Sequence, residues 1–185
     1  FRNNGKIVKA DLSLKDLKLD YLLGEKIDQL SLVETDIQTN LSSKKNFLNL
    51  SGKYSLNNNN TLNFKISNTF NKELINMELI ADYDELLDLK ILNYLKKKGD
   101  LAKIKLNLTK KKNSLKISHV SFDDNRNSLK LENASFSKGK LISLQDLSVK
   151  TYKNGKKNND FSIIFNTNIS IKGEQFDASY LPKIL

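Results

Sequence analysis

Few residues in this chain of 185 residues could carry out chemistry. It contains no Cys and no Trp, and its one histidine is His119. A Cys nucleophile, a disulfide scaffold and a Cys-based metal or redox site are therefore excluded. A His-ligated metal centre or a Ser-His triad would lack its partners, so we interpret His119 as a structural residue.

Two groups of carboxylates have spacings that could suggest a reactive centre. The first group lies close enough in sequence to suggest calcium binding, but the Gly and terminal Glu of a calcium loop are missing, which favours an acidic loop. Its members are Asp82, Asp84, Glu85 and Asp88. The second group, Asp123 and Asp124, is followed by Asn and Arg and is typical of a turn. The seven glycines are scattered singly, so there is no phosphate-binding loop. The sequence therefore predicts no enzyme, no catalytic residue, no metal and no cofactor.

The charge is strongly positive, with 31 Lys and Arg against 21 Asp and Glu, a net charge of +10. Lysines cluster at 96–98, 110–112 and 156–157, but only two residues are Arg, and aromatic residues are not interleaved with them. Nucleic-acid binding is therefore disfavoured. With 24 Asn in the chain, much of the Lys excess is explained by an AT-rich genome, and weak attraction to anionic lipid headgroups is the functional alternative.

The elements that would position any site are strands, because apolar residues recur with period two. In the segment 102–109, Ala102, Ile104, Leu106 and Leu108 alternate with polar residues, and similar runs recur along the chain. Turn residues separate the runs, among them Asn154-Gly155, a two-residue hairpin signal that we place in a longer loop. This rhythm predicts an all-β fold, a long antiparallel meander with little helix.

Several strands change parity in the middle, which predicts β-bulges near Asp16, His119 and Asn133 and hence a curved sheet. The segment 84–98 fits either a strand or a helical face; we favour a strand because its neighbours are strands. The segment 178–185 is expected to form a short helical turn or a lead into a following section. We expect residues 1–185 to form one section of a longer protein, without an internal boundary.

The apolar rows are the feature that could have a function. They could close against a second sheet and form an ordinary sandwich, or they could line an open trough. Large aromatic residues, which usually fill a sandwich core, are few in these rows, and no Greek-key partition is visible. The pattern leaves both alternatives open. We predict an apolar floor made of Leu48, Leu50, Leu62, Phe64, Ile66, Ile104, Leu106, Leu115, Ile117, Leu129, Leu131, Ile163 and Phe165.

Two stretches near the N-terminus carry a family resemblance: LSLKDLKLDYLLGEKIDQLSLVETDI (Leu12–Ile37) and FLNLSGKYSLNNNNTLNFKI (Phe47–Ile66). The closing stretch IKGEQFDASYLPKIL adds Gly173, Phe176, Asp177 and Leu181, in a Gly-x-x-Phe/Leu-Asp-x-x-x-Leu arrangement. With these features the chain resembles AsmA-like envelope proteins of Gram-negative bacteria, of the YhdP and TamB type. The resemblance is mostly one of strand texture, and only the last stretch approaches a motif.

The resemblance implies a β-sheet bent into a trough that conducts phospholipids between the inner and outer membranes. It also implies a periplasmic section of a protein anchored in the inner membrane through a segment not included here, with possible envelope protein partners. The ligands would be phospholipid acyl chains, and no nucleic acid is expected. The alternative function is that of a closed structural or adhesive β-domain that binds proteins at a sheet edge.

Overall fold

The computed structural model describes residues 8–17, 27–40, 46–57 and 59–179, with side chains described from residue 29 onward. The described residues form thirteen β-strands and one short 3-10 turn, Lys90–Leu92. The strands are β1 Val8–Leu17, β2 Ile27–Asn40, β3 Asn46–Leu56, β4 Leu62–Phe70, β5 Leu74–Tyr83, β6 Leu87–Leu89, β7 Tyr94–Lys96, β8 Ala102–Lys111, β9 Ser114–Asp124, β10 Asn127–Ser137, β11 Lys140–Lys153, β12 Lys156–Phe165 and β13 Ile169–Gln175.

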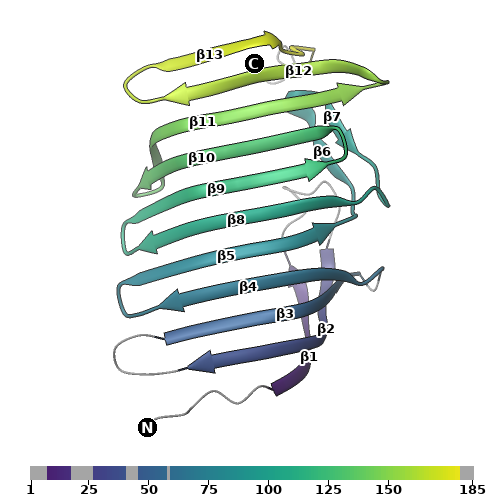
Figure 1. Ribbon diagram of the computed structural model, residues 1–185, viewed down its shortest axis with the longest axis vertical. Helices are drawn as coiled ribbons and strands as arrows, with labels where there is room; N and C mark the ends of the chain where they lie inside the picture. Colours follow the sequence, from purple (N-terminus) through teal and green to yellow (C-terminus); the bar gives the residue numbers. More distant parts are fainter. Residues whose placement is uncertain (1–7, 18–26, 41–45, 58, 180–185) are drawn as a thin grey trace.

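Eleven of these strands form one antiparallel sheet in the order β1-β2-β3-β4-β5-β8-β9-β10-β11-β12-β13. Each strand pairs with its neighbour in the chain, except that β5 pairs directly with β8 (Figure 1). The sheet is open, since β1 and β13 do not pair with each other. The predicted fold class, an antiparallel meander that forms an open trough, is confirmed.

The tight turns follow from residues that accept a positive φ. Lys138-Gly139 joins β10 to β11 with φ values of 48° and 78°, and Asn154-Gly155 joins β11 to β12 with 52° and 76°. Two successive positive φ values match the right-handed twist of the flanking strands. Because Lys153 pairs with Lys156, Asn154-Gly155 is the whole connection, and the predicted longer loop is wrong.

A register shift marks a bulge at one of the three predicted places, beside His119. The register between β8 and β9 shifts at Asn107/Leu108, where β9 carries an extra residue beside His119. Asn133 on β10 has a φ of 49° and lies in line with that bulge. Near Asp16 the prediction is wrong, because the pairing of β1 with β2 is regular there. The extra residue is in β2 instead, where Glu34 has a φ of 47°.

Two glycines lie where the backbone of a neighbouring strand approaches closely. A Cβ at Gly52 would lie 2.8 Å from the carbonyl oxygen of Glu34, at the bulge in β2. A Cβ at Gly173 would lie 2.4 Å from the carbonyl oxygen of Asp160, at a register shift between β12 and β13. Both register shifts therefore require glycine, on the facing strand at Gly52 and on the strand with the extra residue at Gly173.

The segment 84–98 departs from the expected strand within the meander. β6 and β7 form a separate two-stranded hairpin, closed by the 3-10 turn and a left-handed Asn93 (φ 48°). The helical periodicity of the segment corresponds only to that short turn. The amide of Gly99 donates to the carbonyl oxygen of Asp84 (2.7 Å), which closes the base of the hairpin beside β5 and β8.

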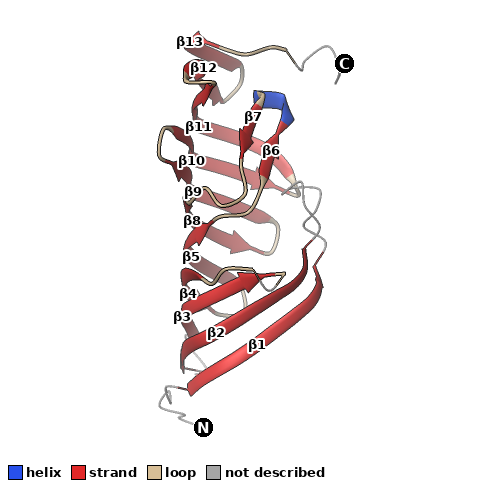
Figure 2. Cartoon of the chain, turned by 90° about the vertical axis from the view of Figure 1, so that its right-hand side faces the viewer, coloured by secondary structure: helices blue, strands red, loops and turns tan. Residues whose placement is uncertain are grey.

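The sheet is a single layer, and the hairpin β6–β7 stands over one of its faces (Figure 2). In the same view β1 and β2 bend toward the side on which the hairpin lies. Among the described residues the only second sheet is this two-stranded hairpin, which covers part of the face, so the sandwich alternative is wrong. Of the segment 178–185, only 178 and 179 are described, the first without regular structure and the second as a turn, and the rest of that prediction lies outside the described residues.

Candidate functional site

An unbroken row of apolar side chains crosses the sheet at right angles to its strands. Partners in register point to the same face, so the pairing can be followed from β2 to β13 without a polar residue. This central row consists of Ile37, Leu50, Ile66, Leu79, Leu106, Val120, Leu131, Leu147, Ile163 and Ile171. At about 4.8 Å per strand, the row extends about 40 Å.

All thirteen residues predicted for the floor lie on this one face. Leu50, Ile66, Leu106, Leu131 and Ile163 belong to the central row. Parallel rows on either side contain the others, which are Leu48, Leu62, Phe64, Ile104, Leu115, Ile117, Leu129 and Phe165. The register thus places on one face side chains that are up to 117 positions apart in the sequence (48 to 165).

The prediction omitted several residues of the same face. The alternation of their own strands could have identified the five residues that complete the central row, which are Ile37, Leu79, Val120, Leu147 and Ile171. Asn68 had no such signal: it is the polar residue between Leu48 and Met77 in a neighbouring row. Its Oδ1 is buried and has no hydrogen-bond partner among the described residues.

The floor remains accessible over most of its area. Of the thirteen predicted residues only Phe64 is buried, with 7% of its surface exposed, and the others are partly exposed. The buried core gathers instead where the hairpin meets the sheet. It consists of Tyr54, Leu56, Phe64, Ala81, Tyr83, Leu87, Tyr94, Ala102 and Phe122. The sheet therefore has a closed end beneath the hairpin and an open apolar floor beside it.

Aromatic contacts hold the hairpin on the sheet. The ring of Phe122 on β9 lies edge-on to Tyr94 of the hairpin (6.3 Å between centroids) and to Tyr83 of β5 (6.5 Å). The hydroxyl of Tyr94 donates a hydrogen bond to the buried carboxylate of Asp124. Burial and this hydrogen bond both raise the pKa of Tyr94. The phenol therefore stays protonated and continues to donate at physiological pH.

Lys96 is a buried cation at the base of the hairpin, with 1% of its surface exposed. Its Nζ donates to the carbonyl oxygens of Glu85 (2.8 Å) and Lys97 (3.1 Å) and lies 5.2 Å from the centre of the Tyr83 ring. Desolvation by burial lowers its pKa, although nearby carboxylates oppose this. The ammonium group replaces its lost water with carbonyl and ring contacts, which fixes the hairpin where it leaves the sheet.

A second polar network holds the far end of the hairpin. The side chain of Asn159 on β12 donates to the carbonyl oxygen of Leu92 (2.7 Å). The side chain of Asn93 donates to Asp177 (2.8 Å), and the amide of Asp177 donates to the Oδ1 of Asn159 (2.9 Å). Phe176 beside it stacks edge-on against Phe161 (5.1 Å). Phe176 and Asp177, which carried the resemblance, therefore tie the segment after β13 to the hairpin tip.

Replacing Asp177 with Ala is expected to lower the free energy of unfolding by about 1 kcal/mol near neutral pH. Hydrogen bonds from Ser179 and then Asn93 lower the pKa of Asp177 to about 2, from an ordinary value of 3.8. The ionised carboxylate thus stabilises the fold above pH 3.8, and this contribution is lost as the pH falls from 3.8 to about 2.

Denaturant unfolding of both proteins at neutral pH and near pH 2 measures this effect. The difference between wild type and Asp177→Ala should be present at neutral pH and largely lost at the lower value. The exposed Glu73, in the turn between β4 and β5, provides the control substitution Glu73→Ala. A difference that persists unchanged near pH 2 would show that the carboxylate charge plays no part.

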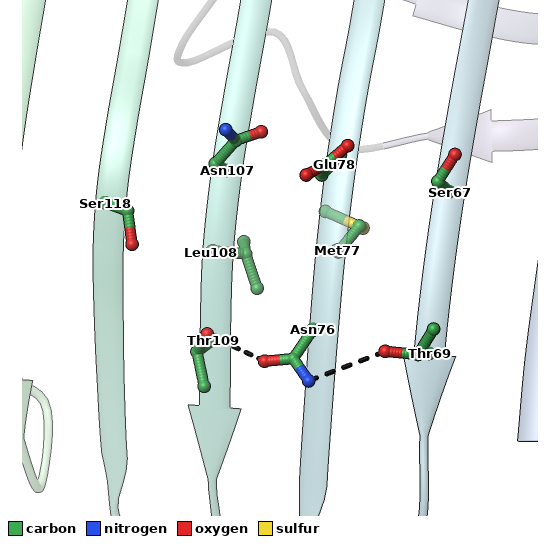
Figure 3. A pocket seen from close by; sticks show the side chains of 9 residues that line it. All are labelled: Ser67, Thr69, Asn76, Met77, Glu78, Asn107, Leu108, Thr109 and Ser118. Carbon is green, nitrogen blue, oxygen red and sulfur yellow. Dashed lines mark hydrogen bonds between the residues drawn. The ribbon is translucent and has the colours of Figure 1, made fainter. Parts of the chain in front are cut away.

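The opposite face of the sheet is polar. In the row adjacent to the central one, only Ile80 is apolar, and Lys65, Lys105, Lys130 and Lys172 alternate with serines. A depression of about 460 Å³ lies on this side, where Thr109 donates to Asn76 (2.8 Å) and Asn76 donates to Thr69 (3.5 Å) (Figure 3). The hydroxyl and amide groups there satisfy one another and form no reactive pair.

The residues that the sequence offered for chemistry form contacts with neighbouring elements of the fold. His119 lies 2.6 Å from Glu132 on the adjacent strand. Asp123 and Asp124 are neighbours at the end of β9 and so point to opposite faces; the predicted turn begins one residue later, at Asn125. Asp124 accepts from Asn127 (2.6 Å) as well as from Tyr94.

The acidic residues 82–88 brace the loops around the base of the hairpin. Asp84 and Glu85 are buried; they accept hydrogen bonds from Asn60 (3.2 Å) and Asn59 (2.6 Å), and Lys98 pairs with Glu85 (2.8 Å). Within the described part of the chain, no three His, Cys, Asp or Glu side chains gather in a way that could hold a metal ion. The same residues include no helix with the length and apolar character to cross a membrane.

The arrangement as a whole can hold an elongated apolar ligand along the central row without forming or breaking bonds. No family model, curated protein or solved structure matches the chain.

Proposed function

We propose that the open apolar face binds the acyl chains of phospholipids and provides a path along which they move. The observation that carries this proposal is the central row, in which ten consecutive strands of the described sheet each contribute an apolar side chain to a face that remains accessible. Monomeric proteins rarely leave contiguous apolar surface of such extent exposed unless it binds something.

The energetic argument is independent of any catalytic group. Burying one methylene group is worth about 0.8 kcal/mol, so carrying a sixteen-carbon chain through water would cost about 12 kcal/mol. A continuous apolar floor removes most of this barrier. Because each strand contributes a similar side chain, one position along the row differs little in energy from the next, which favours sliding over tight binding at one place.

The resemblance to AsmA-like envelope proteins agrees with this function. In that setting the chain would be a periplasmic section of a protein anchored in the inner membrane, and it would help carry phospholipids toward the outer membrane. The accessible apolar face supports the proposed ligand class, whereas the proposed location and direction of transport rest only on the resemblance.

The test is the lipid content of the purified chain. After removal of detergent and loosely bound lipid, mass spectrometry of an organic extract should detect phospholipid in stoichiometric amounts. A chain that carries none, and that acquires none when incubated with vesicles, would contradict the proposal.

A second candidate function, protein binding by strand addition, is favoured by the exposure of β13. All seven residues of this strand are exposed, and in the described part of the chain no strand pairs with its outer side. Ile169 and Ile171 have 69% and 63% of their surfaces exposed. A partner strand could pair with this edge and continue the apolar rows. Protein capture without lipid in the extract would favour this function.

A further inference from the structure

A cleft of about 520 Å³ lies between the hairpin and the turn that joins β11 to β12. In the hairpin, Asp88 pairs with Leu95, so these two side chains point to the face opposite that of the buried Leu87 and Lys96. Tyr152 and Lys153 at the end of β11 line the other side of the cleft. Tyr94 also lines the cleft, so the cleft adjoins the aromatic core at that residue.

The charge inside the cleft is positive. Lys90, Lys97 and Lys153 line it together with a single carboxylate, that of Asp88. None of these three lysines forms a salt bridge with another residue of the described ranges. This contrasts with Lys98 and Lys157, which pair with Glu85 (2.8 Å) and Asp160 (2.6 Å). Three ammonium groups thus share one concave site with a single carboxylate, which leaves an excess of positive charge there.

One of the ammonium groups is held in place. The Nζ of Lys153 donates to the Oδ1 of Asn93 (2.7 Å), and Asn93 is itself tied to Asp177 at the hairpin tip. An ammonium group has three donors, so Lys153 keeps two for a ligand. The network at the hairpin tip thus positions a cation at the wall of the cleft.

Exposed apolar side chains adjoin the cations. Leu95, which lines the cleft, has 56% of its surface exposed, and Ile91 in the 3-10 turn beside Lys90 has 52% exposed. Cations next to exposed aliphatic groups complement a lipid headgroup, in which a phosphate lies next to the glycerol ester and the acyl chains. A soluble anion would use only the cations.

We propose that this cleft binds the phosphate group of a phospholipid headgroup. Lys90, Lys97 and Lys153 would supply the positive charge, and Leu95 would contact the apolar part of the same lipid. The lysines of the cleft by themselves support phosphate binding, whereas the choice of a lipid over free phosphate rests also on the proposed function.

The test compares two double variants that remove the same charge. Lys90→Gln with Lys153→Gln alters the cleft, and Lys110→Gln with Lys111→Gln alters an exposed lysine cluster at the turn between β8 and β9. Co-sedimentation is measured with vesicles of phosphatidylcholine containing phosphatidylglycerol. The cleft variant is expected to bind about tenfold more weakly, and the control to remain within about twofold of the wild type. Equal losses would show general attraction by a positively charged protein and would overturn the proposal.

A second arm distinguishes the two sources of phosphate. Amide chemical shifts of the hairpin and of residues 152–154 are followed during titration with inorganic phosphate and with glycerol phosphate. Shifts at these residues, together with the vesicle result, support a headgroup site. If the shifts occur but the two variants bind vesicles equally, free phosphate is the ligand and the lipid assignment falls.

The outcome is separable from that of the proposed function. The cleft variant should still carry acyl chains in the extraction assay, because Lys90 and Lys153 do not belong to the apolar rows of the sheet. If the wild-type chain carries no copurified lipid, the proposed acyl path is contradicted, but the vesicle comparison still tests the cleft. If the two double variants bind vesicles equally while lipid still copurifies with the wild-type chain, only the proposed headgroup site in the cleft is contradicted.

Discussion

The variant Leu106→Asp with Ile117→Asp is expected to lose at least nine tenths of its crosslinking to a lipid that carries a photoreactive acyl chain. Leu106 lies in the central row between Leu79 and Val120, and Ile117 lies in the neighbouring row between Leu108 and Ala134. A carboxylate at either position would have to lose its water beneath an acyl chain, which is costly without a partner. The two substitutions together interrupt the floor at its middle.

The fold should survive this change because both positions are partly exposed. Far-ultraviolet circular dichroism should therefore retain the β-sheet signal. Asn107→Asp with Ser135→Asp introduces the same two charges on the polar face of β8 and β10 and is the matched control. Equal crosslinking of the two double variants would argue strongly against an acyl path on this face.

The second large effect is expected at Phe122. Replacing it with Ala should lower the free energy of unfolding by about 3–5 kcal/mol, the usual cost of removing a buried aromatic ring. Phe122 has 8% of its surface exposed and contacts both Tyr83 and Tyr94, so its removal empties the centre of the core beneath the hairpin. Urea denaturation measures this loss.

Val120 provides the comparison on the same strand and the same face, two residues away. It is only partly buried and lies on the open floor, so Val120→Ala should cost about 1 kcal/mol. Hydrogen exchange should also increase at residues 86–96 in Phe122→Ala but not in Val120→Ala. Similar losses for the two variants would mean that the hairpin does not form the principal core.

The two predicted effects distinguish two parts of the molecule, the core beneath the hairpin and the open floor. Phe122 and the hairpin form the buried core, whereas Leu106 and Ile117 belong to the accessible floor that we propose to bind acyl chains. A protein with a single-layer sheet needs such a division, because one face of each strand has no protein layer to pack against. The hairpin supplies that layer over one end only.

The faces of the sheet could be predicted from the sequence because strand geometry is local. Side chains two positions apart point the same way, so the alternation in Leu106 and Leu108, or in Leu48 and Leu50, assigns a side before any partner is known. The floor residues were predicted on this basis, and the register places all of them on one face. The change of parity at Asn133 was also visible in the sequence, and there the backbone adopts a positive φ while β10 keeps its register with β9 and β11.

Features that depend on contacts across the chain could not be predicted in the same way. Leu87 and Leu89 alternate like residues of a strand in the main sheet. They belong instead to the separate hairpin, in which Tyr94 packs against Phe122 and donates a hydrogen bond to Asp124. The change of parity near Asp16 looked like that at Asn133. Whether such a change produces a bulge depends on the facing strand, which at that place pairs regularly.

The sequence by itself determined that the chain is a β-meander with one apolar and one polar face, because period-two alternation and turn residues act over a few positions. Only the tertiary structure decided that the apolar face stays open, that residues 84–98 cover one end of it, and that Asn93 meets Asp177 from 84 positions away. The physical reason is that the exposure of side chains, the pairing of strands and the hydrogen bonds between distant residues depend on which segments become neighbours. That choice is made by the free energy of the whole fold and not by any one strand.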